Sequence, residues 1–331
     1  MSREKILSLL LEQGDSYVSG EAMSRTLGIS RAAVWKAIEA LRQEGYEIQS
    51  ATKRGYRLER APDRVREGEL AGPLSGCHVG SRLICLDVID STNTEAKRQA
   101  MAGASDGLVI LSEEQTGGRG RRGRSFVSPA GKGLYLSAAL RPQCPLSEIS
   151  TLTAWTAVAL CDAVESVCGV RPGIKWPNDL VLNRKKLCGI LTELTVEAET
   201  GTVDSIVAGI GVNVRQRPED FPPELRTIAG SVRSETGLEI SRARLAAEMV
   251  RALDQMYLDW QRDPRAYLDD YRARCVTVGR PVRVVRGEDV RTGFAEAVDD
   301  DFALVVRWPD GTRETVTGGD VSVRGLFGYL D

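Results

Sequence analysis

The chain has 331 residues, a formal net charge of −2 and 42% hydrophobic residues, which is enough for two or three domains with sizeable cores. A nearly neutral chain has no overall electrostatic attraction to nucleic acid or to an anionic membrane. No run of 18 apolar residues is present, so we expect no membrane span.

The seven cysteines and the single histidine also limit the chemistry. The cysteines are scattered and form no C-x-x-C pair, which is typical of reduced, buried thiols in a cytoplasmic protein. The lone histidine, His78, lies in a glycine-rich stretch. Ser-His-Asp, Cys-His and multi-histidine metal sites all need histidine beside other groups. We therefore expect a structural role for His78 and chemistry based on Lys, Arg and Asp.

The first sixty residues have the pattern of a winged helix-turn-helix. Helices are predicted over residues 4–12, 20–27 and 31–44, with serine N-caps before the second and third, and a basic hairpin follows over 46–58. The third helix can enter a major groove while the hairpin reaches phosphates. A module for protein interaction is the alternative, but the small and cationic residues that begin the third helix favour DNA. The expected DNA contacts are Arg31, Ala32, Lys36, Lys53 and Arg54.

Residues 60–74 are charged and contain two prolines, which is typical of a connector between domains. We place the first boundary there and expect domains over 1–62, 63–272 and 273–331. The last of these alternates apolar and polar residues between turn signals, which predicts short strands of a small barrel.

A strand predicted over 82–89 ends at Ser91, Thr92 and Asn93. Thr92 and Glu95 match the capping box, so a helix should begin here. Donors at a strand end and a helix N-terminus converge on a small polar group. Capping alone would explain Thr92 but would leave Ser91 and Asn93 without a role.

The stretch from Gly118 to Phe126 reads Gly-Arg-Gly-Arg-Arg-Gly-Arg-Ser-Phe; we call it the Arg loop. Glycine lets backbone N–H groups approach a ligand, and arginine adds fixed charge and bidentate donors. The loop should close over an anion with phosphate and carboxylate character. Its match to G-x-G-x-x-G lacks the Rossmann context, because Pro129 discourages a following helix and no acidic ribose partner follows. A solvated basic loop, or one that contacts nucleic acid, is the other alternative.

Lys175-Trp-Pro-Asn-Asp places a cation, a ring, an amide and a carboxylate in five residues. Pro177 cannot donate to a sheet, so this stretch should form a bulge or turn between strands. Gly209 and Gly211 lie in a predicted buried strand, where they indicate the close approach of another group. Strands are also predicted at 133–140, 185–194 and 203–214, and a long buried helix at 148–167.

These residues together point to one chemistry. Arg119, Arg121 and Lys186 could neutralise a substrate carboxylate and the α-phosphate of a nucleotide at once, which lowers the barrier to joining two anions. Asp179 could hold Mg²⁺, which prefers few carboxylates together with phosphates and water. The sequence therefore predicts activation of a carboxylate by adenylation, without a covalent enzyme intermediate.

Four motifs, in their order, resemble those of biotin–protein ligases: Gly118-Arg-Gly-Arg-Arg-Gly, Lys175-Trp-Pro-Asn-Asp, Lys186-Leu-Cys-Gly-Ile-Leu and Gly209-Ile-Gly-Val-Asn-Val. The resemblance covers nearly the whole chain, and the winged helix makes it similar to members that also repress biotin genes. The implied fold is α+β, with an N-terminal winged helix-turn-helix, a central mixed-sheet α/β ligase domain and a C-terminal SH3-like small β-barrel.

The resemblance implies that biotin and ATP give biotinyl-5′-AMP and pyrophosphate. Biotin then passes to a lysine of the biotin carboxyl carrier protein of acetyl-CoA carboxylase. Lys186, Arg121 and Asp179 are the implied catalytic residues, and Asp179 is also the implied Mg²⁺ ligand. Asp179 could accept the proton of the target lysine or only orient Lys186. The implied biotin site is Ser91, Thr92, Asn93, Gln115, Arg119, Gly120, Arg121 and Lys186.

The implied nucleotide site comprises Lys175, Asn178 and Asp179. Some members carry a tryptophan in the segment that corresponds to residues 215–233, but none is present here. Adenine stacking is therefore assigned to Phe126 or Trp176.

Regulation and two rival functions complete the expectations. Residues 1–60 hold ten Lys and Arg against eight Asp and Glu, a balance that predicts weak binding of a single copy to operator DNA. Biotinyl-AMP, as corepressor, should favour a homodimer by ordering the Arg loop. The rivals are a ligand-sensing repressor without ligase activity and a lipoate ligase. The intact set of loop arginines with Asp179 and Lys186 disfavours the first, and the complete Arg loop beside a fused winged helix disfavours the second.

Overall fold

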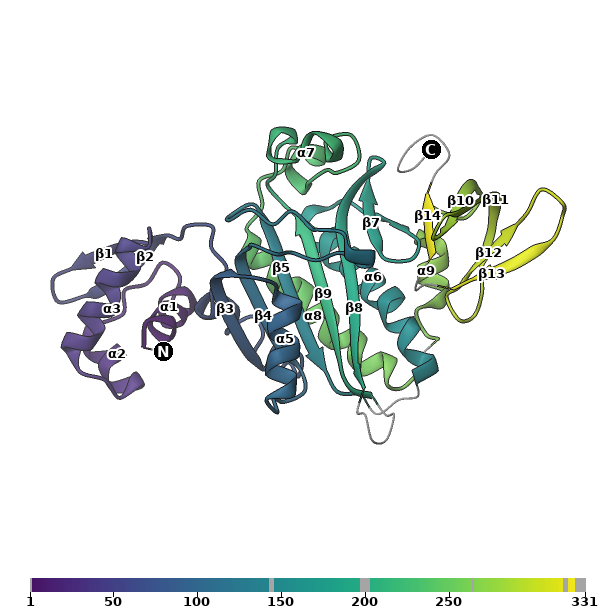
Figure 1. Ribbon diagram of the computed structural model, residues 1–331. Coiled ribbons are helices and arrows are strands. Elements are labelled where there is room, and N and C mark those ends of the chain that lie inside the picture. Colours follow the sequence, from purple (N-terminus) through teal and green to yellow (C-terminus); the bar gives the residue numbers. More distant parts are fainter. Residues whose placement is uncertain (1, 143–145, 197–202, 264, 318–320, 325–331) are drawn as a thin grey trace. The chain divides into compact units, whose positions relative to one another are not determined.

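The computed structural model describes residues 2–142, 146–196, 203–263, 265–317 and 321–324 (Figure 1). Internal contacts divide the chain into two units. One comprises Met1–Gly76 with Ser241–Ala247, and the other comprises Cys77–Ile240 with Glu248–Asp331. Each unit has a hydrophobic core of its own.

The N-terminal unit confirms the winged helix-turn-helix. Ser19 Oγ accepts the N–H of Ala22 at 3.0 Å, and Ser30 Oγ accepts the N–H of Ala33 at 3.2 Å, so both predicted N-caps are present. Gly28 ends the second helix with a φ of 65°, a left-handed conformation that favours glycine. The elements are α1 (Ser2–Glu12), α2 (Gly20–Leu27), α3 (Arg31–Gln43), β1 (Glu47–Ala51) and β2 (Gly55–Arg60).

Residues 60–74, the predicted connector between domains, fall within this unit. They contain a short helix, α4 (Glu67–Leu70), that packs on α1. The N–H of Gly68 donates to the Glu4 carboxylate at 3.1 Å, and a Cβ at residue 68 would lie 2.6 Å from the Glu4 carbonyl oxygen. The apolar Leu70 is fully buried. This tertiary contact holds the segment against the unit despite its charged residues and prolines.

Within the described residues, the central sheet of the second unit has seven strands in the order β3-β4-β5-β9-β8-β7-β6. The strands β3 and β4 pair in parallel, because the helix α5 (Thr92–Met101) returns the chain between them, and the other neighbouring strands described in this sheet pair antiparallel. The sheet is therefore mixed, as expected. The strands are β3 (Arg82–Ile89), β4 (Leu108–Gln115), β5 (Gly133–Leu140), β6 (Gly173–Lys175), β7 (Asp179–Leu182), β8 (Lys185–Val196) and β9 (Val203–Asn213).

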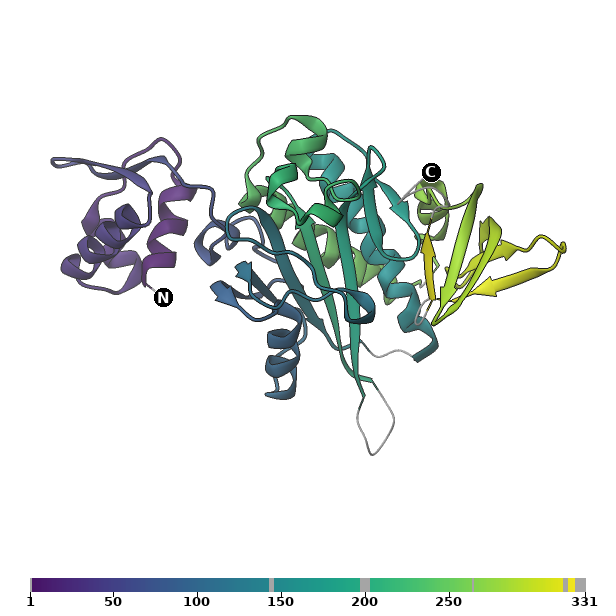
Figure 2. The ribbon, with the colours of Figure 1, turned by 45° about the horizontal axis from the view of Figure 1, so that its top comes forward.

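Helices cover both faces of this sheet, with α5 on one face and α6 and α8 on the other (Figures 1 and 2). The window Thr151–Cys168 of α6 has a mean hydropathy of 1.2, long and apolar enough to cross a membrane by composition, yet 72% of it is buried inside the protein. That burial is typical of a core helix. The remaining helices are α6 (Leu146–Cys168), α7 (Val232–Thr236), α8 (Arg242–Trp260), α9 (Leu268–Arg274) and the 3₁₀ turns Arg121–Gly123, Pro218–Asp220 and Pro223–Leu225.

The C-terminal strands form an antiparallel sheet in the order β13-β12-β11-β10-β14. Within the part of the chain that the structure describes, β13 and β14 are edge strands that do not pair, so the short strands are confirmed and a closed barrel is not found. The strands are β10 (Arg280–Arg286), β11 (Asp289–Val298), β12 (Leu304–Arg307), β13 (Arg313–Val316) and β14 (Val321–Arg324).

The described cysteines are free thiols, as expected, but two of them are less buried than expected. Cys77 and Cys85 are only partly buried, and Cys144 lies outside the described residues. The other four are free and buried: Cys161, Cys168, Cys188 and Cys275.

Candidate active site

The end of β3 brings Ser91, Thr92 and Asn93 into the interior, where each is less than 5% exposed. The predicted capping box is wrong. Ser91 is the N-cap of α5 and makes no side-chain cap bond, while the Glu95 carboxylate accepts from other residues of α5. Thr92 is free for the site because the helix begins one residue earlier than the capping pattern predicts.

Thr92 joins a hydrogen-bonded network that spans α5, β4 and β5. Gln115 Oε1 accepts the backbone N–H of Thr92 at 2.9 Å and its hydroxyl at 3.1 Å. Gln115 Nε2 donates to Ser128 Oγ at 2.9 Å, and Ser137 Oγ donates to Thr92 Oγ1 at 2.8 Å. The network fixes the orientation of the Gln115 amide, which retains one N–H for a ligand.

Asn93, on α5, connects two strands, β8 and β5. Its Nδ2 donates to the Leu191 carbonyl at 3.2 Å and to Glu193 at 2.9 Å, and its Oδ1 accepts from Ser137 at 2.6 Å. A Cβ on Gly209 would overlap Asn93 Oδ1, which confirms that this glycine permits a close approach. Both N–H donors of Asn93 are thus committed to the protein, so Asn93 shapes the pocket.

The Arg loop closes on itself between β4 and β5. The N–H of Gly120 donates to Arg124 O at 2.7 Å, and the N–H of Phe126 donates to Gly118 O at 2.9 Å. Arg122 has a φ of 59° inside the short 3₁₀ turn. No helix opens after the loop, which agrees with the rejection of the Rossmann alternative.

Arg121 points from the loop toward the Lys175–Asp179 motif. Its Nη1 donates to Asn178 Oδ1 at 3.1 Å. Burial lowers the pKa of the Arg121 guanidinium, and the neighbouring charge of Asp179 acts in the opposite direction. A guanidinium remains charged at physiological pH even so, and we infer that Arg121 is a partly desolvated cation suited to an anionic ligand.

The Lys175–Asp179 motif forms the predicted turn between strands. Lys175 pairs with Asp179 across β6 and β7, and the Trp176–Pro177 peptide is cis. Asn178 and Ile190 exchange two hydrogen bonds, from Asn178 Nδ2 at 2.7 Å and from the Ile190 N–H at 2.9 Å. The turn is therefore fixed to β8.

Lys186 and Asp179 face each other across β7 and β8. Lys186 Nζ lies 2.7 Å from Asp179 Oδ1, and both side chains are largely buried. The Lys186 backbone is held by Ile228 O at 2.7 Å and by Asn213 Nδ2 at 3.4 Å. The ammonium is therefore placed by its carboxylate partner and by a fixed main chain.

Two adjoining cavities meet at Lys186, which lines both, while its partner Asp179 lines the larger one. The larger has a volume of about 600 Å³ and the smaller of about 50 Å³. Among the described residues, the larger cavity is lined by one carboxylate, Asp179, and by six cations: Arg121, Arg122, Arg124, Lys175, Lys186 and Arg283. The smaller one contains the predicted biotin residues Ser91, Thr92, Asn93, Gln115, Arg119, Gly120, Arg121 and Lys186.

The two residues proposed to stack on adenine differ in accessibility. Trp176 is 2% exposed, and its indole Nε1 donates to Phe302 O at 2.8 Å. Phe126 is partly exposed and lines both cavities. The ring of Trp176 serves the contact with the C-terminal sheet, whereas Phe126 lies where the cavities join.

Several residues of the site were missed in the sequence, among them Arg283 of β10, which lines the larger cavity. Glu193 pairs with Lys97 at 2.5 Å and with Arg119 at 3.5 Å. Ser137 joins the networks of Thr92 and Asn93, and Asn213 holds the main chain at Lys186. Glu193 and Ser137 are polar residues inside apolar strands, and this was the signal by which the sequence could have indicated them. Asn213 belongs to the motif Gly209-Ile-Gly-Val-Asn-Val.

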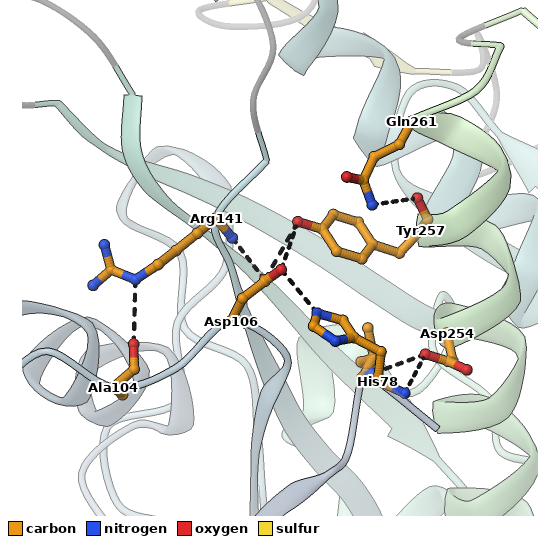
Figure 3. A network of polar contacts seen from close by, with 8 residues as sticks. His78, Ala104, Asp106, Arg141, Asp254, Tyr257 and Gln261 are labelled. Carbon is orange, nitrogen blue, oxygen red and sulfur yellow. Dashed lines mark hydrogen bonds and ion pairs between the residues drawn. The ribbon is translucent and has the colours of Figure 1, made fainter. Parts of the chain in front are cut away.

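His78 lies outside both cavities, in a separate polar cluster on α8 and the loop before β4 (Figure 3). His78 Nε2 is 2.8 Å from Asp106 Oδ2, and the Tyr257 hydroxyl donates to the same carboxylate at 3.1 Å. The His78 N–H donates to Asp254 Oδ1 at 2.9 Å. These contacts hold the first residues of the second unit against α8 and the loop before β4, which agrees with a structural role for His78.

The predicted DNA-contacting residues lie at the surface of the N-terminal unit. All are exposed, on the first turns of α3 or at the tip of the β1–β2 hairpin: Arg31, Ala32, Lys36, Lys53 and Arg54. The Arg54 guanidinium lies 4.3 Å from the centroid of the Tyr17 ring, so an aromatic contact orients the wing.

Profiles of three known families match the chain. Residues 85–213 match the biotin/lipoate A/B protein ligase family, residues 2–57 match an HTH domain, and residues 277–324 match the biotin protein ligase C-terminal domain. Together they cover both units.

Individual relatives are similar over nearly the full length. The bifunctional ligase/repressor BirA of Bacillus subtilis is 36% identical over 94% of this chain and 96% of its own, and that of Escherichia coli is 33% identical over 96% of both. The biotin protein ligase of Aquifex aeolicus, solved in complex with biotin and ATP, has a TM-score of 0.64 and 26% identity, covering 74% of this chain and 99% of that one. The chain therefore belongs to the biotin/lipoate protein ligase family, in its class of bifunctional ligase/repressors.

Proposed function

We propose that this chain joins biotin to ATP, giving biotinyl-5′-AMP and pyrophosphate. It then transfers biotin to a lysine of the biotin carboxyl carrier protein of acetyl-CoA carboxylase. The observation that supports this best is the position of Lys186, which lines both a small cavity and a larger, strongly cationic one and lies 2.7 Å from Asp179 in the larger cavity. A carboxylate in the first cavity and a triphosphate in the second would bring their reacting ends to this ion pair.

The first step joins two anions. An oxygen of the biotin carboxylate attacks the α-phosphorus of ATP, and the bond to the bridging oxygen of pyrophosphate breaks. Lys186 and Arg121 offset the repulsion, and their placement before the reaction makes the stabilisation effective. The depressed pKa of Arg121, caused by burial, reflects the desolvation that strengthens its attraction to an anion.

The second step is aminolysis of the adenylate. The target lysine amine attacks the acyl carbon, AMP leaves with the electron pair, and the amine loses a proton. Asp179 is the acidic group that lines the larger cavity within the described ranges. Its contact with Lys186 supports the orienting role, and it also lies where it could accept the proton.

The remaining assignments follow the two cavities. Arg119 and Gly120 of the Arg loop and Gln115 line the smaller one, where Gln115 has one N–H left for biotin. Lys175 and Asn178 line the larger one and serve the nucleotide. The burial of Trp176 supports Phe126 as the residue that stacks on adenine.

Mg²⁺ would accompany the triphosphate, and Asp179 would hold it. A single carboxylate is a suitable donor set, because Mg²⁺ takes most of its ligands from phosphates and water. Among the described residues, no group of three or more acidic, histidine or cysteine side chains is arranged so that it could hold a metal ion. When bound, Mg²⁺ would neutralise charge on the phosphates.

The winged helix adds a second function, repression of biotin genes with biotinyl-5′-AMP as corepressor. The exposed cations of α3 and of the hairpin tip support binding to operator DNA. Residues 1–60, with a net charge of only about +2, would bind weakly as a single copy, so a ligand-induced homodimer is part of the proposal.

The division into domains over 1–62, 63–272 and 273–331 stays a proposal, as does the SH3-like barrel at the C-terminus. Trp176 supports a functional link to the last of these domains, because it places the Lys175–Asp179 motif against Phe302.

One assay tests the reaction and separates it from its rivals. The protein is incubated with ATP, Mg²⁺ and either biotin or lipoate, and the acyl-adenylate and a labelled carrier domain are quantified. Biotinyl-5′-AMP followed by labelled carrier is the expected result. Lipoyl-AMP alone would make the chain a lipoate ligase, and no adenylate from either acid would leave only a regulator.

A further inference from the structure

Trp35 stands apart from the other tryptophans of the chain. It is 55% exposed, whereas Trp155, Trp176, Trp260 and Trp308 are at most 3% exposed. Tryptophan is large and mostly apolar, so an exposed one is uncommon unless a partner covers it. It was not among the DNA contacts expected from the sequence.

Trp35 lies on the outward face of α3. The opposite face packs into the core through Val34, Ile38 and Leu41. Residues three and four positions apart share a helix face, so Trp35 neighbours Arg31 and Ala32 in the preceding turn, and both are exposed.

The surroundings of Trp35 carry charge that suits DNA. Lys36 follows Trp35 directly and Arg31 lies one helical turn before it, and within the described part of the chain no ion pair engages either cation. Glu39, one turn further on, is paired with Arg42 at 2.6 Å. The start of α3 is therefore an apolar patch of Ala32 and Trp35 between unpaired cations, the chemistry of a surface that meets a thymine methyl between phosphates.

We propose that Trp35 contacts the C5-methyl group of a thymine in the major groove and thereby contributes sequence specificity. The inference rests on the proposed DNA-binding function and deepens it. Cations that touch phosphates carry affinity without sequence information, whereas an apolar contact with a base edge carries specificity. Lys53 on the wing and Trp35 on α3 should therefore differ in their effects on binding.

The test begins with a duplex selected from a random library by the full-length protein in the presence of biotin and ATP. Each thymine of that duplex is replaced by deoxyuridine, which removes only the methyl group. At one thymine of each half-site, the replacement should weaken the wild-type protein several-fold. The same replacement should leave Trp35→Ala unchanged, because the contact is already lost.

Two further readouts separate specificity from charge. Trp35→Ala should weaken binding to the selected duplex by about tenfold per half-site, near the lower part of the range for a base contact, with an unchanged dependence on salt. Lys53→Ala should lower the slope of log affinity against log salt by about one, uniformly across sequences. Gln43→Ala, also exposed on α3, is the matched control and should bind as the wild type does.

The native fluorescence gives an independent measurement. Because four tryptophans are buried, acrylamide should quench mainly Trp35, and this accessible component should disappear in Trp35→Phe. The selected duplex should protect it. Retained ligase activity and far-ultraviolet circular dichroism would show that the variants are folded.

Three outcomes would overturn the inference. If Trp35 is shielded from acrylamide before DNA is added, another part of the protein covers it. If Trp35→Ala binds the selected duplex as tightly as the wild type, Trp35 makes no base contact. If the wild type selects no duplex at all, the DNA-binding function itself fails together with this inference.

Discussion

The ring of Phe126 lies directly against Gly211. A Cβ at residue 211 would come within 2.5 Å of Phe126 Cε1. Phe126 ends the Arg loop and lines both cavities, while Gly211 belongs to β9. The absence of a side chain on β9 thus determines how closely the Arg loop can approach the sheet.

Gly211→Ala should displace Phe126 and prevent the Arg loop from closing. We expect biotinyl-5′-AMP to dissociate about tenfold faster, since a misplaced loop loses pre-organised contacts. The dissociation rate is measured by rapidly mixing the protein that holds labelled adenylate with excess unlabelled biotin and ATP and observing the loss of label. Phe126→Leu in the same background should restore part of the retention. Gly72→Ala is the control, because no atom lies within 4 Å of its Cβ. An unchanged dissociation rate in Gly211→Ala would contradict the role of this contact.

Lys186→Gln should lower the rate of adenylate formation by about 10²- to 10³-fold, the typical loss when one group that stabilises developing charge is removed. Pyrophosphate release measures it. Lys185→Gln is a matched control, because Lys185 faces Glu235 at 3.6 Å. Equal losses in the two variants would point to general disruption of β8.

Asp179→Asn distinguishes the two roles of the carboxylate. If Asp179 orients Lys186, adenylate formation should fall by at least about tenfold, and we expect this result from the 2.7 Å contact. If it only accepts the proton of the target lysine, transfer from chemically prepared biotinyl-5′-AMP should fall while pyrophosphate release stays normal.

Arg121→Gly should release biotinyl-5′-AMP early. The substitution removes the bond to Asn178 and a desolvated cation from the junction of the cavities, so adenylate should escape and label lysines of unrelated proteins. Labelling of serum albumin in the same tube measures this escape, and operator binding should weaken in parallel. Arg122→Gly, in the same loop, should have a smaller effect, since Arg122 reaches the backbone of Val285. Tight retention of the adenylate by Arg121→Gly would mean that the loop has another role.

The ionised carboxylate of Glu193 should stabilise the folded protein at neutral pH and lose this effect at acidic pH. Burial acts to raise its pKa, but hydrogen bonds from Lys97 and Asn93 outweigh this and leave the pKa below its usual value. Because the folded-state pKa is depressed, the stabilisation is complete above the unfolded pKa of about 4.3 and is lost as the pH falls through the folded-state pKa. The difference in unfolding free energy between wild type and Glu193→Gln, from urea titrations, should shrink over that acidic window. A difference independent of pH would contradict this account, and Glu21→Gln on exposed α2 is the control.

The local pattern of the sequence determined most of the elements. Ser19 and Ser30 marked their helix starts, because N-capping depends on residues three positions apart. The turn at Pro177 and the close approaches at Gly209 and Gly211 were also predictable, because proline and glycine restrict the backbone wherever they stand. The catalytic chemistry followed from residue types and from motifs whose order is specific.

Tertiary structure alone decided which side chains meet. Thr92 matched a cap by spacing, but Gln115 and Ser137, from two other strands, hold its hydroxyl in the site. The charge and prolines of residues 60–74 did not indicate that Leu70 would be buried. The pairing of Lys186 with Asp179 depends on the register of β7 against β8, which no local pattern encodes. The sequence by itself determined the winged helix, because it depends on residue types at fixed spacing, and it implied the reaction through four motifs that resemble those of biotin–protein ligases. The tertiary structure alone decided where the two cavities join, because strands that are distant in the sequence pack side by side there.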